Sequence, residues 1–428
     1  MHDVAIYSRR IILPGEVVEA TIFIKEGKIS EIRRGENSEH IESLVDAGED
    51  VVMPGIIDPH VHINEPGRTQ WEGFETGTLA ALQGGITCIA DMPLNSTPVT
   101  TTVKAFQQKI ESAKNKLHNK CFFWGGVVPG NENEIEPLIK AGVSGFKAFL
   151  THSGIDDFPN LTEEDLRKVM PIIAKYDLPL LVHCEIQSDF GFQSGDPRSY
   201  NNYLNSRPDS WETDAVKLMI KLCKEFNCHV HIVHLSSSQS LPLIAKAKAN
   251  NLPLTCETAP HYLYYNAEDI EDGNTLLKCA PPIREKANNE LLWDALKSGL
   301  INFIATDHSP CLPFMKNPDT GNFMTAWGGI ASLQFSLPIV WTAGQKHKAT
   351  LNDICRWLCE EPAKLLKLEN KNGQIKVGYD GDLVIWNPEK EFRITESIIK
   401  HRHKETPYLN EVLQGVVKEV YIGGKRKI

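Results

Sequence analysis

The sequence has no long apolar run, and no segment approaches the length of about 18 residues that a membrane-spanning helix needs. Its first residues, Met1-His2-Asp3-Val4, lack the positively charged region and apolar stretch of a signal peptide. The last residues, which end at Ile428, do not form the Ser-Lys-Leu address of peroxisomal proteins. We therefore expect no membrane partner and a cytoplasmic location.

The chain also has no excess of positive charge, because 55 Asp and Glu outnumber 45 Lys and Arg and the formal net charge is -10 at pH 7. A nucleic-acid partner would need a basic face, so the charge argues against one and favours a small, neutral or weakly charged ligand. The ten cysteines include no Cys-x-x-Cys pair and lie mostly in apolar stretches. This arrangement indicates reduced thiols in an intracellular protein rather than a disulfide framework.

The two ends of the chain share one pattern of short segments in which apolar and polar residues alternate. At the N-terminal end these segments include 3–7, 20–25 and 28–32, with a turn at Glu26-Gly27, and at the C-terminal end they include 382–386 and 417–424. Alternation with a period of two predicts strands joined by hairpins. We expect residues 1–53 and 373–428 to form one composite β-sandwich domain whose strands pair in a small antiparallel sheet.

Between these ends, residues 54–372 alternate apolar strand-like runs with helical stretches, which is typical of a parallel sheet with crossover helices. The eight predicted strands are 55–63, 86–92, 121–128, 145–150, 179–185, 229–236, 253–259 and 302–308. Predicted helices include Thr162–Tyr176 and Trp211–Phe226, the second with Ser210 as its cap. Eight such units predict an α/β fold, a TIM-type (β/α)8 barrel, with irregular insertions at 263–285 and 309–328.

Residues of the types that bind metals stand at the ends of five predicted strands. Because all barrel strands present their carboxyl ends at one mouth, these side chains should converge there. They are His60, His62, Lys147, His183, His234 and Asp307. Taken singly, each has an ordinary structural alternative, such as a satisfied core histidine or a paired buried charge. Six together in barrel order predict a site for two metal ions.

Lys147 stands in the apolar segment Gly145-Phe146-Lys147-Ala148-Phe149. An ammonium group has no lone pair for a metal, but burial favours the neutral amine. A neutral lysine can take up carbon dioxide and become a carbamate, whose two oxygens could bridge two metals. We therefore expect carbon dioxide, bound as a carboxyl group on the Lys147 amine, as a cofactor beside the metal ions. The metal is expected to be zinc, with manganese, iron and cobalt as alternatives.

The chain resembles the cyclic amidohydrolases of the amidohydrolase superfamily along almost its whole length. The motifs that carry the resemblance are the His-x-His strand, the segment around Lys147, Thr306-Asp307-His308-Ser309-Pro310 and His401-Arg402-His403-Lys404. The resemblance implies that His60, His62, carboxylated Lys147 and Asp307 hold one metal, and that Lys147, His183 and His234 hold the other. It also implies a homotetramer.

The choice of substrate depends on position 64. Dihydroorotases, which belong to the same family, usually carry there an arginine that binds the carboxylate of dihydroorotate, whereas this chain has Asn64. The resemblance is closest to the branch that hydrolyses the hydantoin ring of allantoin, a neutral molecule, to allantoate in purine catabolism. A dihydroorotase or a hydantoinase is the alternative, and a non-catalytic scaffold related to dihydropyrimidinases is a remote one.

The expected reaction uses a hydroxide held between two metal ions as the nucleophile, with Asp307 as the catalytic residue that accepts its proton and passes it to the leaving nitrogen. Glu185 is expected to bond the free nitrogen of His183. Cys311 is not expected to act as a nucleophile. Residues expected to contact the substrate are Asn64, Asn95, His261, Cys279, Pro281 and Ser309.

Overall fold

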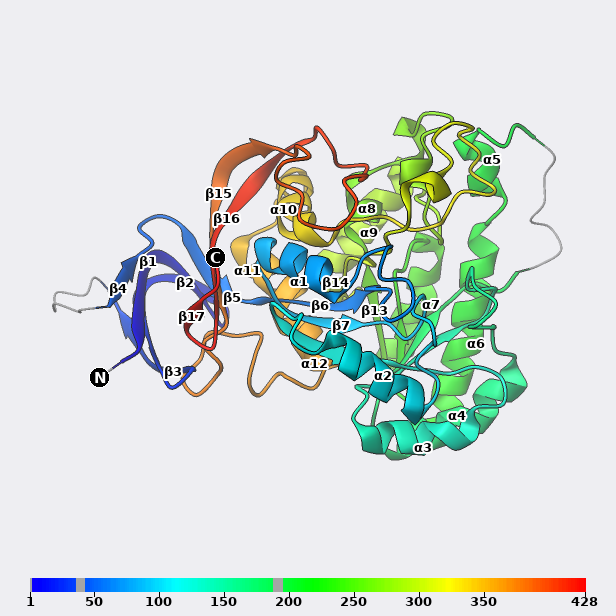
Figure 1. Ribbon diagram of the computed structural model, residues 1–428, viewed down its shortest axis with the longest axis horizontal. Helices are drawn as coiled ribbons and strands as arrows, with labels where there is room; N and C mark the ends of the chain where they lie inside the picture. The colour runs from blue at the N-terminus through cyan, green and yellow to red at the C-terminus, as the bar shows by residue number, and fades with distance from the viewer. Residues whose placement is uncertain (1, 36–42, 188–194) are drawn as a thin grey trace.

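The protein is described here from a computed structural model, which covers residues 2–35, 43–187 and 195–428. A sheet built from both ends of the chain lies beside a larger part in which helices surround parallel strands (Figure 1). None of the helices among the described residues is long and apolar enough to cross a membrane.

One eight-stranded sheet contains strands from both ends of the chain, as the sequence predicts. Its strands are β1 Val4–Leu13, β2 Glu16–Lys25, β3 Lys28–Arg34, β4 Leu44–Asp46, β5 Val51–Pro54, β15 Leu383–Arg393, β16 Val412–Ile422 and β17 Lys425–Arg426. They enclose a hydrophobic core of their own, which includes Ile22, Val52 and Leu383. The predicted domain boundaries stay a prediction.

The expectation of an antiparallel sheet is wrong at one strand, although most pairings in the sheet are antiparallel. β1 pairs antiparallel with β2 but parallel with both β4 and β5. A parallel pairing needs a long connection between its strands, and here β2 and β3 lie between β1 and its parallel partners in the sequence. Because such a partner is distant in the sequence, the local alternation of residues does not reveal it.

The barrel strands are all parallel to their neighbours. They are β6 Ile56–Val61, β7 Ile86–Asp91, β8 Lys120–Phe123, β9 Gly125–Gly126, β10 Phe146–Phe149, β11 Leu180–His183, β12 Val230–Ile232, β13 Leu254–Thr258 and β14 Phe303–Ile304. The third predicted strand is divided at Trp124 into β8, which pairs with β7, and β9, which pairs with β10. A parallel bridge between Val61 at the end of β6 and His308, four residues after β14, links the exits of the first and last strands, as in a (β/α)8 barrel.

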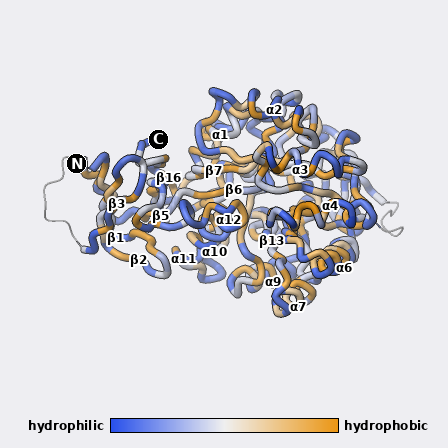
Figure 2. The backbone as a smooth tube through the Cα atoms, turned by 90° about the horizontal axis from the view of Figure 1, so that it is seen from below, coloured by the Kyte–Doolittle hydropathy of each residue, from blue (hydrophilic) through white to orange (hydrophobic). Residues whose placement is uncertain are grey.

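Twelve α-helices lie within the described residues, and most of them cover the outside of the barrel strands (Figure 1). They are α1 Phe74–Gln83, α2 Val103–Ala113, α3 Glu132–Ala141, α4 Glu163–Lys175, α5 Tyr200–Asn205, α6 Asp209–Phe226, α7 Leu241–Ala249, α8 Pro260–Tyr264, α9 Lys286–Lys297, α10 Ser336–Lys346, α11 Leu351–Cys355 and α12 Glu361–Leu365. Hydrophobic stretches run along strands such as β6 and β13, and hydrophobic and hydrophilic segments alternate along the outer helices (Figure 2).

The predicted start is confirmed for α4 but not for α6. α4 begins after Thr162, whose side chain forms a capping box with Asp165. The prediction that Ser210 caps α6 is wrong, because the helix begins at Asp209 and Pro208 occupies the cap position. Asp209 is favourable in the first turn, where its charge meets the positive end of the helix dipole. The helix therefore starts earlier than its apolar periodicity indicates.

Several strands end before the predicted boundary because the chain turns at the metal-type residues. His234 and Asp307 have φ angles of +38° and +45°, which no extended strand can accommodate. β12 therefore ends at Ile232, and β14 is only Phe303–Ile304 instead of the predicted 302–308. The turns place these side chains at the mouth of the barrel.

Candidate metal centre

His60, His62 and Asp307 form the first half of the candidate metal centre. Asp307 Oδ1 lies 3.2 Å from His60 Nε2 and 3.4 Å from His62 Nε2. Within the described part of the chain, these three are the one group of three or more His, Cys, Asp or Glu residues whose ligand atoms all lie within 4.8 Å of one another. The backbone explains their proximity, since the N–H of His62 donates to the carbonyl of His308 at 2.8 Å and joins the exits of β6 and β14.

The first half carries negative charge that a cation would balance. Burial disfavours the charged form of His60, but Glu257 and Asp307 raise its pKa to about 9. Burial also opposes ionisation of Asp307, yet His60 and hydrogen bonds from both histidines hold its pKa well below the usual range. Burial lowers the pKa of His62 to about 4. A divalent cation could replace the proton on His60, and its positive charge would then balance the Asp307 carboxylate.

His183 and His234 form the second half. His183 Nδ1 lies 3.0 Å from His234 Nε2, and His183 Nε2 donates to Glu185 at 2.7 Å, as predicted for Glu185. Burial lowers the pKa of both imidazoles, so both are neutral at pH 7. Neutral imidazoles are the form that binds a metal. The His60 and His234 rings lie 5.4 Å apart, which brings the two halves together.

Lys147 projects from β10 into the same region and is fully buried. Its Nζ has no hydrogen-bond partner and lies 4.9 Å from the centre of the Phe149 ring. Burial lowers the pKa of Lys147 to about 8, partly opposed by Asp307 and Glu257. A buried polar atom without a partner is rare, and here the amine is shifted towards the neutral form that carboxylation requires.

The side chains at the mouth fit a divalent metal site. Nitrogen and carboxylate donors of these types bind zinc and the neighbouring transition metals. Lys147 Nζ is buried without a hydrogen-bond partner, and His60 Nε2 faces the Asp307 carboxylate at 3.2 Å. The fold thus holds several donor groups in place at a cost in stability that a bound cation would offset.

Glu257 was not selected from the sequence. Its two oxygens bond His60 Nδ1 and, at 3.0 Å, His231 Nε2, and it lies fully buried in β13. A carboxylate that bonds the far nitrogen of a ligand histidine fixes the orientation of the ring. The available signal was an acidic residue within the apolar strand predicted at 253–259.

Asp58 was not predicted from the sequence either. It bonds groups next to the donor side chains and not the donor side chains themselves. Asp58 accepts hydrogen bonds from the Thr306 hydroxyl at 2.6 Å and from the N–H of His60 at 3.1 Å. It therefore links the segments that carry His60 and Asp307. Burial raises the pKa of Asp58 to about 6, against the hydrogen bonds that stabilise its charge.

Three of the predicted substrate contacts lie around the first half. Asn64 Nδ2 donates to the Pro310 carbonyl at 3.2 Å, the Asn95 side-chain amide lies 3.3 Å from His62 Nδ1, and Ser309 Oγ donates to Asp307 Oδ1 at 3.0 Å. Their roles toward a substrate stay predictions.

The other three predicted contacts are placed differently. His261 is fully buried and neither ring nitrogen has a hydrogen-bond partner, while burial lowers its pKa to about 4. The carbonyl of Cys279 accepts from Tyr203 at 2.6 Å and that of Pro281 from Tyr262 at 2.8 Å. These bonds hold the segment in place, and its contact with a substrate stays a prediction.

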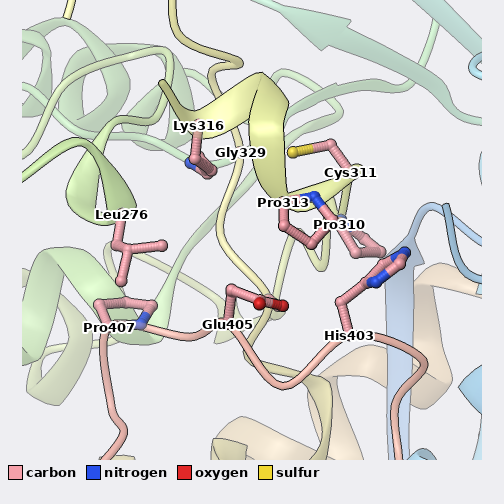
Figure 3. A pocket seen from close by; sticks show the side chains of 10 residues that line it. Leu276, Pro310, Cys311, Pro313, Lys316, Gly329, His403, Glu405 and Pro407 are labelled. Carbon is pink, nitrogen blue, oxygen red and sulfur yellow. The ribbon is translucent and has the colours of Figure 1, made fainter. Parts of the chain in front are cut away.

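A small pocket, with room for about 20 Å³, lies beside the segment that follows Ser309 (Figure 3). Its walls include Cys311 and Lys316 from the 309–328 insertion and His403 and Glu405 from the connection between β15 and β16. The connection from the composite sheet therefore reaches the mouth of the barrel. Burial raises the pKa of Cys311 to about 11, so its thiol is protonated at neutral pH.

Comparison with known proteins places the chain in a family. The model of the amidohydrolase family matches residues 51–427, and the chain belongs to that family. Curated relatives include the allantoinases of Arabidopsis thaliana, with 43% identity over 98% of this chain and 87% of theirs, and of Streptomyces avermitilis, with 43% identity over 99% and 95%. The allantoinase of Saccharomyces cerevisiae is 40% identical over 98% of this chain and 94% of its own.

Solved structures agree with this fold. The L-hydantoinase of Arthrobacter aurescens superposes with a TM-score of 0.94, covers 100% of this chain and 96% of its own, and is 30% identical. A D-hydantoinase gives a TM-score of 0.88 at 26% identity, over 99% and 94% of the two chains. These similarities confirm the predicted barrel with its added sheet and the resemblance to cyclic amidohydrolases.

Proposed function

We propose that this protein is an allantoinase, which hydrolyses the hydantoin ring amide of allantoin to give allantoate in purine catabolism. The observation that carries the proposal is the 40–43% identity to curated allantoinases of a plant, a bacterium and a yeast over at least 98% of this chain. Asn64 supports it, because a neutral amide suits a neutral ring better than the arginine that binds a carboxylate.

The six donor residues are proposed to hold two divalent metal ions. His60, His62, Asp307 and carboxylated Lys147 would hold one, and Lys147, His183 and His234 the other. Zinc is the proposed metal, with manganese, iron or cobalt as alternatives. Bound metal ions supply a water molecule of lowered pKa and polarise the carbonyl group that is attacked.

Asp307 is proposed to move the proton. Its Oδ1 is engaged by His60, His62 and Ser309, whereas within the described residues no hydrogen bond engages Oδ2. Oδ2 can therefore accept a proton from the attacking water and then donate it to the ring nitrogen that leaves. Such transfer is commonly worth about 10² to 10⁴ in rate.

Three further features belong to the proposal. The family resemblance supports a homotetramer, which light scattering on the purified protein tests. All ten cysteines are unpaired, in support of a cytoplasmic location. We also propose residues 1–53 with 373–428 as one domain and 54–372 as the catalytic domain, since one hydrophobic core lies within the composite sheet.

Parallel assays with allantoin, dihydroorotate, hydantoin and dihydrouracil, combined with metal analysis, test the proposal. We expect ring opening of allantoin to dominate, and we expect a chelator to abolish it and added metal to restore it. Turnover of dihydroorotate without turnover of allantoin would identify a dihydroorotase instead. Preference for hydantoin or dihydrouracil would identify a hydantoinase, and lack of turnover with all four would favour a non-catalytic scaffold.

A further inference from the structure

Two asparagines flank His62 in the same unusual backbone conformation. Asn64 and Asn95 have φ angles of +65° and +67°, and their residues are only 1% and 3% exposed. Asparagine tolerates this left-handed region better than most residues, but buried strain of this kind concentrates at functional sites. Each side-chain amide is engaged at one end, by the Pro310 carbonyl for Asn64 and by His62 for Asn95, and its other end has no hydrogen-bond partner.

The orientation of the Asn64 amide is fixed by its partner. Its Nδ2 donates to the Pro310 carbonyl at 3.2 Å, and a carbonyl can only accept. The Oδ1 atom of Asn64 is therefore a free acceptor in a buried setting. A free acceptor of this kind lowers stability unless a ligand supplies a donor.

The orientation of the Asn95 amide follows from His62. His62 Nε2 faces Asp307 at 3.4 Å, so a metal held on that side leaves the proton on Nδ1, which lies 3.3 Å from the Asn95 amide. A half-turn of an amide exchanges its oxygen and nitrogen. Asn95 would then accept from His62 through its oxygen and keep its NH₂ group free as a donor. Arg68, which donates to the Asn95 carbonyl at 3.0 Å, anchors the backbone.

We infer that Asn64 and Asn95 bind the ureido arm of the substrate, Asn64 Oδ1 as acceptor for its N–H groups and Asn95 Nδ2 as donor to its carbonyl. The inference rests on the proposed function. A ureido group is neutral and offers both donors and an acceptor, so it matches this pair of amides. A carboxylate at the same place would meet the Asn64 oxygen and be repelled.

Two variants test the pair with little strain. Asn64→Gly removes the acceptor while glycine keeps the left-handed backbone. Asn95→Asp removes the NH₂ donor and retains an oxygen for His62. Asn227→Gly is the matched control, because Asn227 has a φ of +48° and ends α6, away from the mouth. Each variant is assayed with allantoin and with hydantoin, which lacks the ureido arm and serves as substrate or competitive inhibitor, and its metal content is measured.

We expect each mouth variant to lose about 10- to 100-fold in kcat/KM for allantoin. The kcat/KM or inhibition constant of hydantoin, the metal content and the Asn227→Gly control should stay near wild-type values. Equal losses with both compounds, or no loss with allantoin, would overturn the inference. Metal loss in Asn95→Asp would show that Asn95 serves to orient His62, and it would overturn the inference that Asn95 binds the substrate. A wild-type enzyme that does not open allantoin would instead refute the proposed function.

Discussion

The two halves of the candidate metal centre are built differently. In the first half, His60 and His62 converge on the Asp307 carboxylate, and Glu257 stands behind His60. In the second half, His183 and His234 face each other at 3.0 Å with no carboxylate between them.

The difference lies in negative charge. The carboxylate nearest the second half is Glu185, whose Oε1 accepts from Arg207 at 3.0 Å and whose charge is therefore already balanced. Two neutral imidazoles alone hold a divalent cation weakly compared with a set that contains an anionic ligand. The buried amine of Lys147 can provide that anion only after carboxylation. The second half should therefore depend on Lys147 more than the first.

Replacement of Lys147 is expected to have the largest effect. Lys147→Ala should reduce activity to background and reduce bound metal from about two ions per chain to about one or fewer, because the bridging anion is lost. Metal analysis and the allantoin assay measure both. Short carboxylic acids should restore part of the activity by occupying the space of the missing carbamate. Full activity in the variant without added acid would end the carbamate proposal.

Replacement of Asp307 tests the first half. Asp307→Asn keeps the shape of the side chain but cannot accept a proton, so kcat should fall by about 10² to 10⁴. Because His183, His234 and Lys147 are unchanged, the variant should retain about one metal ion per chain. Steady-state kinetics and metal analysis measure the two quantities. A fall in KM alone, or wild-type kcat, would show that another group moves the proton.

The sequence predicts most of the strands and proposes six donor residues, of which His60, His62 and Asp307 lie together in the structure, because these signals are local. An apolar run ending in His or Asp at a barrel mouth needs no knowledge of distant partners. Glu257 escaped notice because its partners His60 and His231 come from other strands. The parallel pairing of β1 with β5 escaped for the same reason. What sequence reasoning lacked was the set of contacts that only the folded chain brings together.

The carboxylates behind the two halves provide a weaker test of their difference. Glu257→Gln offers one acceptor where His60 and His231 both donate, so it should weaken metal binding by about 10- to 100-fold. Glu185→Gln should weaken metal binding less, because only His183 among the donor residues bonds Glu185 and Gln still offers it an oxygen. The variant also removes the charged partner of Arg207. Metal affinity from competition with a chelator measures both. Equal effects of the two variants would remove this distinction between the halves.

Thr162→Ala is expected to have the smallest effect. It tests whether the position of Lys147 depends on α4, the helix that follows β10. Thr162→Ala removes the capping box of α4 and should lower the free energy of unfolding by about 1 kcal/mol. Thr350→Ala is the matched control, because Thr350 forms the same box with Asp353 at α11, away from Lys147. If the rigid barrel alone positions Lys147, both variants should lose similar stability in urea titrations and keep full metal content. Selective metal loss in Thr162→Ala would show that the second half relies on α4 as well as on charge.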